Sequence, residues 1–450
     1  MPSPNRNRRR LHVNPDHARR THVPAPSDAE IERRLTDLVK PAVYAELDYY
    51  RLLGHRNRLL GLPVMVALVL TLIWRRVPGV CTLQRMLARE RILWTEPTTV
   101  SQPALSERFL TFPAVLFERV LYRVLSRLPE RQAARTRPLP PALATLPSRF
   151  AACYALDGTT LEALFRKLQT LRERPEAPLA GHLGVAVDLL THLPAKLWWA
   201  DDPATNDKAL APALLSWLPA GSLLVFDLGY FAFWLFDALT SAHSFFVTRM
   251  REKASYAVER VLVNRAQVRD QIIKLGLYKG NGQCQHSMRL IEVFVNGRWQ
   301  RYLTNVLDPQ QLSVVEVVAL YDARWSIETT FLLVKRLLDL SYLWVGSLNG
   351  VKVQVLATFL FYAILIDLCD DVAEVLGLAL EQISVEMVYR GLYHYVTAMA
   401  QQGYAGDAPS YLAREAQGLG IIKRQRVRDG PSVTEQIRRA LVAPPLLDAT

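Results

Sequence analysis

The segment YDARWSIETTFLLVK, residues 321–335, places four polar side chains among apolar neighbours. Its composition predicts a largely buried helix. Because a helix turns about 100° per residue, Tyr321, Arg324, Glu328 and Lys335 are expected to share one arc of roughly 60°. A solvated helix face usually carries more balanced charge than two cations with one carboxylate. The segment therefore predicts a functional polar stripe along a buried helix.

Two aspartates stand where strands are expected to end. The runs RFAACYALD (149–157) and SLLVFD (222–227) are typical of strands, and they end on Asp157 and Asp227. A single aspartate at such a position is more often a turn or cap residue. With Glu328 on a helix packed beside both strands, the two aspartates would form the carboxylate cluster that polynucleotide enzymes use for Mg²⁺.

Such a cluster suits phosphodiester chemistry. Two metal ions roughly 3.5–4 Å apart would activate the attacking oxygen and stabilise the leaving one. Arg324 and Lys335 would then hold the phosphates that flank the scissile bond, and Tyr321 would hydrogen-bond a phosphate.

The polar stripe also resembles a known signature. Its spacing, Tyr-x2-Arg-x3-Glu-x6-Lys, matches at all four positions the signature of the DDE transposases of the IS-four insertion-sequence superfamily, which includes the Tn-five transposase. The blocks ALDGTTL (155–161) and VFDLGYFAFWLFDAL (225–239) are similar to those that carry the first and second catalytic aspartates. The resemblance covers about residues 150–370. One departure is Leu228, which stands where many relatives have an Arg or a Lys.

The resemblance implies an α/β fold, a ribonuclease H-like catalytic domain with an antiparallel β-insertion between the second aspartate and the glutamate. It also implies a Mg²⁺-dependent DNA transposase, with Mn²⁺ able to substitute, that acts on transposon ends and target DNA as a homodimer in a synaptic complex. Water would hydrolyse a phosphodiester at the element's end and free a 3′-OH. That hydroxyl would attack the opposite strand or the target without a covalent protein intermediate.

The resemblance also implies roles for individual residues. The metal ligands would be Asp157, Asp227 and Glu328, and the phosphate contacts would be Tyr321, Arg324 and Lys335. Trp299 precedes Glu328 by 29 residues and lies in the β-insertion. In relatives that form a DNA hairpin, a Trp in this region stacks on a flipped base. A Trp that only pins a β-hairpin is the alternative.

Composition favours a polyanionic partner. Fifty-four Lys and Arg residues against 42 Asp and Glu give a net charge of +12, which favours nucleic acid first and an anionic membrane second. The four cysteines show no metal-ligand spacing, which indicates reduced thiols in a cytoplasmic protein. For a transposase, the resemblance implies a place at the bacterial nucleoid. The apolar runs 59–74 and 355–368 are shorter than the roughly 20 residues of a spanning helix. We therefore expect them to be buried core helices, with no membrane association.

The distribution of charge and the periodicity of apolar residues divide the chain into regions. We expect a disordered basic arm at 1–28, a helical and DNA-binding domain at 29–128, a Pro-rich linker at 129–148, the catalytic domain at 149–370 with its β-insertion at about 251–312, and a helical C-terminal region at 371–450. In the helical domain Ser101 is a plausible N-cap. Gln102, Ser106 and Arg108 would face a DNA groove in a helix-turn-helix, whereas an ordinary helical bundle is equally compatible with the pattern.

Within the catalytic domain the spacing of apolar residues predicts, between 149 and 249, three strands followed by a helix, a strand, a helix and a strand. A β-hairpin is predicted at 289–303 around Asn296-Gly297, and one long helix at about 313–340. Asp188 and Asp207 match no catalytic position, so we expect them to be structural. The histidines at 182, 192, 243 and 286 lack zinc-ligand spacing.

Two other functions fit the same residues. One is a non-transposing metal-dependent nuclease on the same fold. The other is a catalytically inactive DNA-binding relative, against which the intact Asp, Asp and Glu set argues. Short inverted repeats in the flanking DNA would favour the transposase.

Overall fold

The computed structural model describes residues 28–55, 58–160, 181–202, 205–276, 282–338, 340, 347–424 and 431–444. Apart from its last residue, the basic arm expected at 1–28 lies outside these ranges. So does most of the basic run KRQRVR at 423–428.

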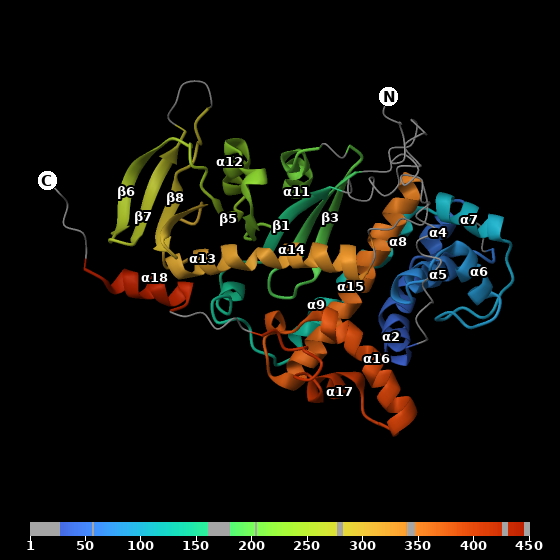
Figure 1. Ribbon diagram of the computed structural model, residues 1–450. Coiled ribbons are helices and arrows are strands. Elements are labelled where there is room, and N and C mark those ends of the chain that lie inside the picture. Colours follow the sequence, from blue (N-terminus) through green and yellow to red (C-terminus); the bar gives the residue numbers. More distant parts are fainter. Residues whose placement is uncertain are drawn as a thin grey trace, which may run out of the picture.

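One mixed sheet forms the centre of the molecule (Figure 1). Its first half has the order β3-β2-β1-β4-β5, in which β1, β2 and β3 pair antiparallel while β1, β4 and β5 pair parallel. The order of strands and helices predicted between 149 and 249 is confirmed. The strands are β1 (Cys153–Thr160), β2 (His182–Asp188), β3 (Pro194–Ala200), β4 (Leu223–Phe226) and β5 (Phe245–Arg249).

Four further strands extend this sheet to nine. They are β6 (Tyr256–Asn264), β7 (Val268–Leu275), β8 (Met288–Val295) and β9 (Arg298–Thr304). The predicted hairpin is confirmed, because Asn296 and Gly297 turn between β8 and β9 with φ of 52° and 75°. Since β9 pairs antiparallel with β5, the insertion continues the main sheet and does not form a separate subdomain.

Helices cover both faces of the sheet (Figure 1). One face is covered by α11 (Ala211–Trp217) and α12 (Phe233–Ser241), and the other by α13 (Val314–Ala323), α14 (Trp325–Leu332) and the π-helix η7 (Leu333–Leu337). Alternate strand residues supply the two cores: Leu156 and Phe226 pack towards α12, and Ala155 and Val225 pack on the opposite side.

The helix predicted at 313–340 is divided rather than regular. The amide of Ile327 bonds to the carbonyl of Arg324, three residues back, which tightens the backbone between α13 and α14. Beyond α14 the chain widens into the π-turn that contains Lys335. The irregularities therefore fall on the polar stripe itself.

The N-terminal and C-terminal helices pack together. The long helix α15 (Leu348–Leu376) contacts α5 (Leu62–Trp74), α8 (Ala114–Leu125) and α17 (Ala408–Arg414), and its apolar residues share one core with them. The remaining helices of these regions are α2 (Ala29–Arg34), η2 (Leu35–Val39), α3 (Lys40–Tyr44), α4 (Leu47–Leu52), α6 (Val80–Leu87), α7 (Gln102–Thr111), α9 (Leu128–Ala133), α16 (Val385–Gln402) and α18 (Val433–Val442).

Both apolar runs form core helices, as predicted. By length and composition α15 alone among the described helices could cross a membrane, but 89% of its most apolar window is buried inside the protein. The expected linker at 129–148 is also fixed in place. Its Arg135 forms ion pairs with Asp367 at 2.8 Å and Asp370 at 2.6 Å on α15. These buried pairs tie the segment that precedes the sheet to the helical core.

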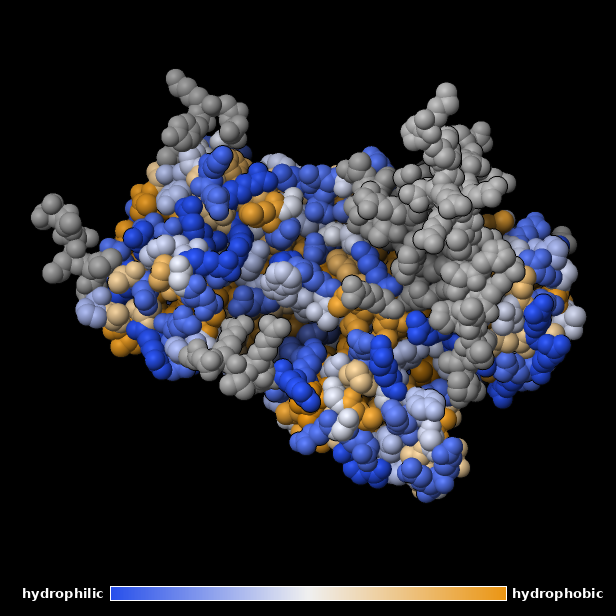
Figure 2. Space-filling view, viewed as in Figure 1, coloured by the Kyte–Doolittle hydropathy of each residue, from blue (hydrophilic) through white to orange (hydrophobic). Residues whose placement is uncertain are grey.

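The face seen in Figure 2 is hydrophilic over much of its middle, with hydrophobic patches towards the end that carries β6 to β8. On the edge strand β6, Val258 and Val261 are about half exposed.

Candidate active site

Asp157 and Asp227 occupy equivalent positions on adjacent parallel strands. Leu156 on β1 pairs with Phe226 on β4, and each aspartate is the next residue. Asp227 follows the last residue of its strand, as predicted. The prediction that β1 ends on Asp157 is wrong, because antiparallel pairing with β2 carries β1 on to Thr160. Asp157 nevertheless lies at the carboxyl edge of the sheet, since its parallel partner β4 has ended.

The backbone beside each aspartate holds its carboxylate. Gly158 N donates to Asp157 Oδ1 at 2.8 Å. Gly229 N donates to Asp227 Oδ1 at 2.7 Å, so that Asp227 caps the short 3₁₀ helix η6 (Leu228–Tyr230). In both aspartates the nearby backbone amide bonds to Oδ1, so Oδ2 is not used by that amide.

Arg324 brings Glu328 to this edge of the sheet. Its Nη2 donates to Glu328 Oε1 at 2.8 Å, and its Nη1 lies 3.5 Å from Asp157 Oδ2. The guanidinium is buried and therefore stands between two carboxylates that are distant in sequence.

The other two stripe residues also contact the sheet. Lys335 Nζ donates to Thr159 Oγ1 on β1. The Tyr321 ring packs edge-on against Tyr302 of β9, with the guanidinium of Arg249 5.4 Å from its centroid. The polar stripe predicted from helical spacing therefore faces the edge at which Asp157 and Asp227 lie.

The electrostatics reflect the crowding of like charges. Burial raises the pKa of Asp157 to about 6, and the negative charges of Asp227 and Asp207 add to the shift despite Arg324. Burial also lowers the pKa of Lys335, which Asp157 partly offsets. The pKa of the buried Tyr230 hydroxyl is raised by burial and then by Asp207, Asp157 and Asp227, which places this phenol close to three carboxylates.

These side chains suit a hard divalent cation by their chemistry. The donors are carboxylate oxygens, which Mg²⁺ and Mn²⁺ prefer. Gly158 and Gly229 keep the space beside them open, because a Cβ at either position would collide with a carboxylate oxygen. Among the described residues no three His, Cys, Asp or Glu side chains lie close enough together to hold a metal ion.

Asp207 was expected to be structural, and His182 was expected not to be a zinc ligand. Asp207 begins the 3₁₀ helix η5 (Asp207–Leu210), and its Oδ1 lies 2.7 Å from Nε2 of His182 on β2. The sequence pattern missed this pair because neither residue shows a recognised spacing. The only local signal is the glycine that follows closely after each of the two aspartates, Gly158 and Gly229, whose missing side chains make room for Asp207. Asp188, in contrast, caps a turn, as predicted.

Trp299 stands apart from the carboxylates. Its ring packs edge-on against Phe294 of the neighbouring strand, with the guanidinium of Arg269 4.8 Å from its centroid. Strand residues alternate between faces, so Trp299 lies on the face opposite that of Tyr302, the residue that contacts Tyr321. The ring is 39% exposed at one end of the hairpin.

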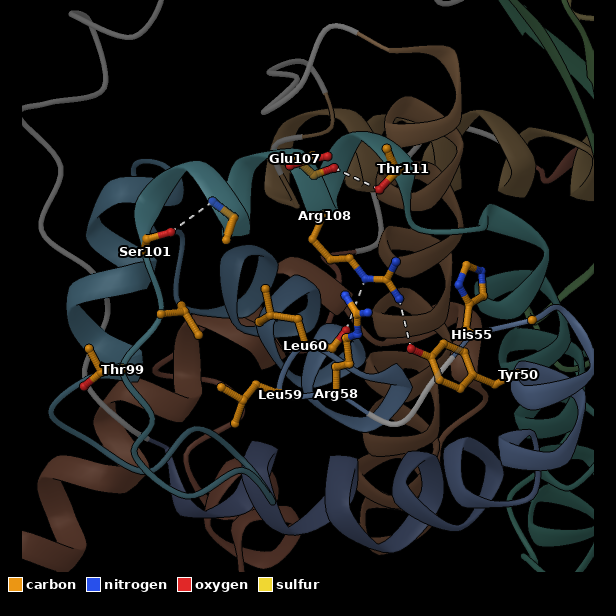
Figure 3. Close-up of a pocket in the computed structure, with 13 residues that line it drawn as sticks. Tyr50, His55, Arg58, Leu59, Leu60, Thr99, Ser101, Glu107, Arg108 and Thr111 are labelled. Atoms are coloured by element: carbon orange, nitrogen blue, oxygen red, sulfur yellow. Dashed lines mark hydrogen bonds between the residues drawn. The ribbon is translucent and has the colours of Figure 1, made fainter.

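The N-terminal helices enclose a pocket of about 1110 Å³ (Figure 3). Ser101 caps α7, as predicted, by accepting from Ala104 N at 3.3 Å. Arg108, one of the candidates for a DNA groove, turns inward and donates to Tyr50 Oη at 2.9 Å and to the carbonyl of Leu60 at 3.2 Å. In this conformation Arg108 joins the helices, as the bundle alternative predicts.

The comparison with known families identifies the domain around this site. Residues 151–364 match the family of the transposase DDE domain. The matched region of the DDE domain contains β1 to β9, both aspartates, Glu328 and the first part of α15. The expectation of a DDE-type transposase domain is confirmed at this level.

Two relatives give the same indication. A protein named as the transposase of insertion sequence element IS5377 from Geobacillus stearothermophilus is 28% identical over 170 residues, which are 37% of this chain and 44% of that protein. A protein named as the transposase y4zB from Sinorhizobium fredii is 27% identical over 172 residues, which are 36% and 47%. The chain thus spans less than half the length of either relative.

A solved structure of a piggyBac transposase synaptic complex with hairpin DNA covers 95% of this chain and 89% of its own, at 11% identity and a TM-score of 0.37. That likeness is too low to support an inference on fold or function.

Proposed function

We propose that the protein is a DNA transposase of the IS-four insertion-sequence superfamily, which cleaves and joins DNA strands at the ends of a mobile element. The observation that carries the proposal is the meeting of Asp157, Asp227 and Glu328 at one edge of the sheet, inside a transposase DDE domain. The order β3-β2-β1-β4-β5, with antiparallel then parallel pairs, supports a ribonuclease H-like fold.

Asp157, Asp227 and Glu328 would hold the divalent cation, Mg²⁺ or Mn²⁺. When bound, such a cation supplies Lewis-acid stabilisation of the attacking and leaving oxygens. The three carboxylates accept no proton in the reaction; they bind and orient. Because like charges gathered at a buried site repel one another, the metal-free site is electrostatically strained.

The cations of the stripe would bind the DNA backbone. Arg324, Lys335 and Tyr321 stand on the helix edge beside the carboxylates. The two charged side chains and the phenol hydroxyl are donors that contact phosphate oxygens without reading sequence. In the DNA-free protein Arg324 balances Asp157 and Glu328. We propose that it exchanges them for a phosphate when cation and DNA bind, since the cation then neutralises the carboxylates.

The partners follow from this function. The net charge of +12 favours DNA binding, both to transposon ends and to target DNA. A homodimer in a synaptic complex would bring two ends together, in the cytoplasm at the nucleoid. Trp299 would stack on a flipped base if cleavage passes through a hairpin.

A cleavage assay tests the proposal. Asp157→Asn, Asp227→Asn and Glu328→Gln should each abolish Mg²⁺-dependent nicking of a labelled end fragment while binding in a gel shift stays nearly intact. Asp48→Asn, which removes a carboxylate that is 90% exposed on α4, is the matched control and should cleave normally. Full cleavage by any of the three variants would refute the assignment of that carboxylate.

A further inference from the structure

The two edges of the nine-stranded sheet differ in how they are covered. At the β3 edge, Leu197 N donates to Tyr122 Oη of α8 at 3.0 Å, so a helix satisfies an outward amide of this strand. At the other edge, which Figure 1 shows at the outer end of the molecule, β6 pairs with β7 alone among the described strands. An edge strand in this state offers unpaired N–H and C=O groups to another strand.

The outward part of β6 combines apolar side chains with opposite charges. Four consecutive residues are exposed, Val258, Glu259, Arg260 and Val261, and the two valines are 47% and 52% exposed. Neither Glu259 nor Arg260 forms an ion pair with any residue that the structure describes. Duplex DNA would meet Glu259 with like charge and leave both valines uncovered, so the patch fits a protein surface better than a nucleic acid.

A β-bulge places the two valines on one face of the sheet. Val258 stands opposite Ile273 of β7, and a register shift follows directly after it, so Val261 stands opposite Gln271. Residues two apart on a strand share a face, so Ile273 and Gln271 point to the same side, as do the valines opposite them. Bulges are one way in which proteins protect an edge strand, but this bulge gathers an apolar pair on the exposed edge.

The exposed edge of β6 is complementary to itself. An inverted copy of β6, related by a two-fold axis between residues 259 and 260, places Glu259 of each chain against Arg260 of the other. The same axis places Val258 against Val261. Because a two-fold axis perpendicular to the sheet keeps the faces unchanged, residues that meet across it have to share a face, as these valines do. The flanking residues that would meet next are also apolar: Tyr256, Ala257, Leu262 and Val263.

We infer that two copies of the protein pair antiparallel through β6 in the absence of DNA and so continue the sheet across a two-fold axis. Two-fold contacts of this kind use the same patch on both subunits, and strand addition at an exposed edge supplies main-chain hydrogen bonds. Opposite charges across the contact fix its register, whereas like charges oppose it. The contact goes beyond the proposed function, because it requires neither DNA nor a metal ion.

Sedimentation velocity of the full-length protein, in EDTA and without DNA, tests the inference by exchanging charges. Between about 1 and about 100 µM the wild type should pass from monomer to dimer, as expected of a small interface. Glu259→Arg and Arg260→Glu should each weaken the dimer at least tenfold, because both create like-charge pairs across the axis. The double variant that carries both changes should recover most of the loss. Arg390→Glu, on an exposed side chain of α16, is the control for charge reversal.

Three results would overturn the inference. The first is a wild type that stays monomeric at all these concentrations. The second is a dimer that neither single variant weakens, because another surface then joins the copies. The third is a double variant that binds no tighter than the single ones, because the two charges then do not meet.

Cross-linking tests the register without changing any charge. In a Cys81→Ser background, which removes an exposed thiol, an equal mixture of Val258→Cys and Val261→Cys proteins should form disulfide-linked dimers on mild oxidation. Each variant alone should cross-link much more slowly, because its cysteine then faces a valine. Equal rates in the mixture and in the separate proteins would overturn the pairing.

The two proposals fail separately. A monomeric wild type that nicks the end fragment refutes only the contact through β6, whereas a dimer that never cleaves DNA refutes the transposase.

Discussion

Arg324 Nη1 lies 3.5 Å from Asp157 Oδ2, so an ion pair joins the helix that carries the polar stripe to the first strand of the sheet. The same guanidinium also bonds to Glu328. A side chain therefore supplies positive charge to these two carboxylates. Cation and DNA would compete with this internal arrangement, which makes Arg324 a link between the two binding events.

The first prediction concerns phosphate contacts. Each contact adds about −0.9 to the slope of log K against log salt for duplex DNA. Arg324→Gln and Lys335→Gln should each lower the magnitude of this slope by about one unit for random duplex, in Mg²⁺-containing buffer. The control is Arg390→Gln, on an exposed side chain of α16 that pairs with Glu386. Slopes that match the wild type in both stripe variants would show that neither side chain touches phosphate.

The second prediction concerns pH. The folded protein raises the pKa of Asp157 from 3.8 to about 6, so between about pH 4 and pH 6 it keeps a proton that the unfolded chain has lost. The contribution of Asp157 to stability therefore falls as pH rises through this window, and it stays unfavourable above it. Asp157→Asn should stabilise the metal-free protein at pH 7 by about 1–3 kcal/mol, and the gain should vanish near pH 4.

Urea unfolding in EDTA from pH 4 to pH 8 measures this difference. Asp48→Asn, on an exposed side chain, controls for the loss of one negative charge. If Asp157→Asn proved less stable than the wild type at pH 7, the ion pair with Arg324 would outweigh the repulsion and burial that raise the pKa.

The third prediction concerns the start of the stripe helix. Glu316 closes a capping box with Ser313 at the N-terminus of α13, and Arg149 Nη2 lies 2.7 Å from its Oε1. Burial opposes its charge, but the hydrogen bonds from Arg149, Ser313 and Thr145 prevail and lower its pKa from 4.5 to about 2. The resulting stability is present above pH 4.5 and is lost as pH falls towards 2.

Glu316→Gln should therefore lower the free energy of unfolding by about 1–3 kcal/mol at pH 7, with the difference shrinking below pH 4.5. Glu386→Gln, which removes a more exposed charge from α16, should change little. A Glu316→Gln protein with wild-type stability at pH 7 would contradict the role of this cap.

The fourth prediction separates two cleavage routes. Base stacking on an aromatic ring contributes about 1–3 kcal/mol. If a flipped base displaces Arg269 from the ring of Trp299, Trp299→Ala should leave the first nick at its normal rate and slow hairpin formation about tenfold or more. Nicked and hairpinned products on a denaturing gel, followed over time beside a melting curve, give the answer. Phe294→Leu, which weakens the packing of the hairpin but keeps the indole, is the control.

Each outcome has a distinct meaning. Equal slowing of both products with a large fall in melting temperature would leave Trp299 as a structural residue, consistent with its contact to Phe294. Unaltered kinetics in Trp299→Ala would remove it from the mechanism.

The sequence by itself determined those features that depend on local periodicity. The alternation of strands and helices between 149 and 249 and the Asn296-Gly297 turn follow from backbone geometry that is set locally. The common face of Tyr321, Arg324, Glu328 and Lys335 was predicted from the 3.6-residue repeat, although the helix that carries them is divided. The two aspartates became candidates only in combination with this polar stripe and the resemblance to the transposase blocks, because a single aspartate after strand residues is more often a turn or cap residue.

Only the tertiary structure decided which distant segments meet. Nothing local in β5 and β9 indicates that they pair and merge the insertion with the main sheet. The inward turn of Arg108 and the approach of Asp207 to Gly158 and Gly229 likewise depend on packing between elements far apart in the chain. Such contacts are set by the shape and charge of surfaces that exist only after folding, so a residue with no recognisable spacing, such as His182, meets its partner Asp207 only in the folded chain.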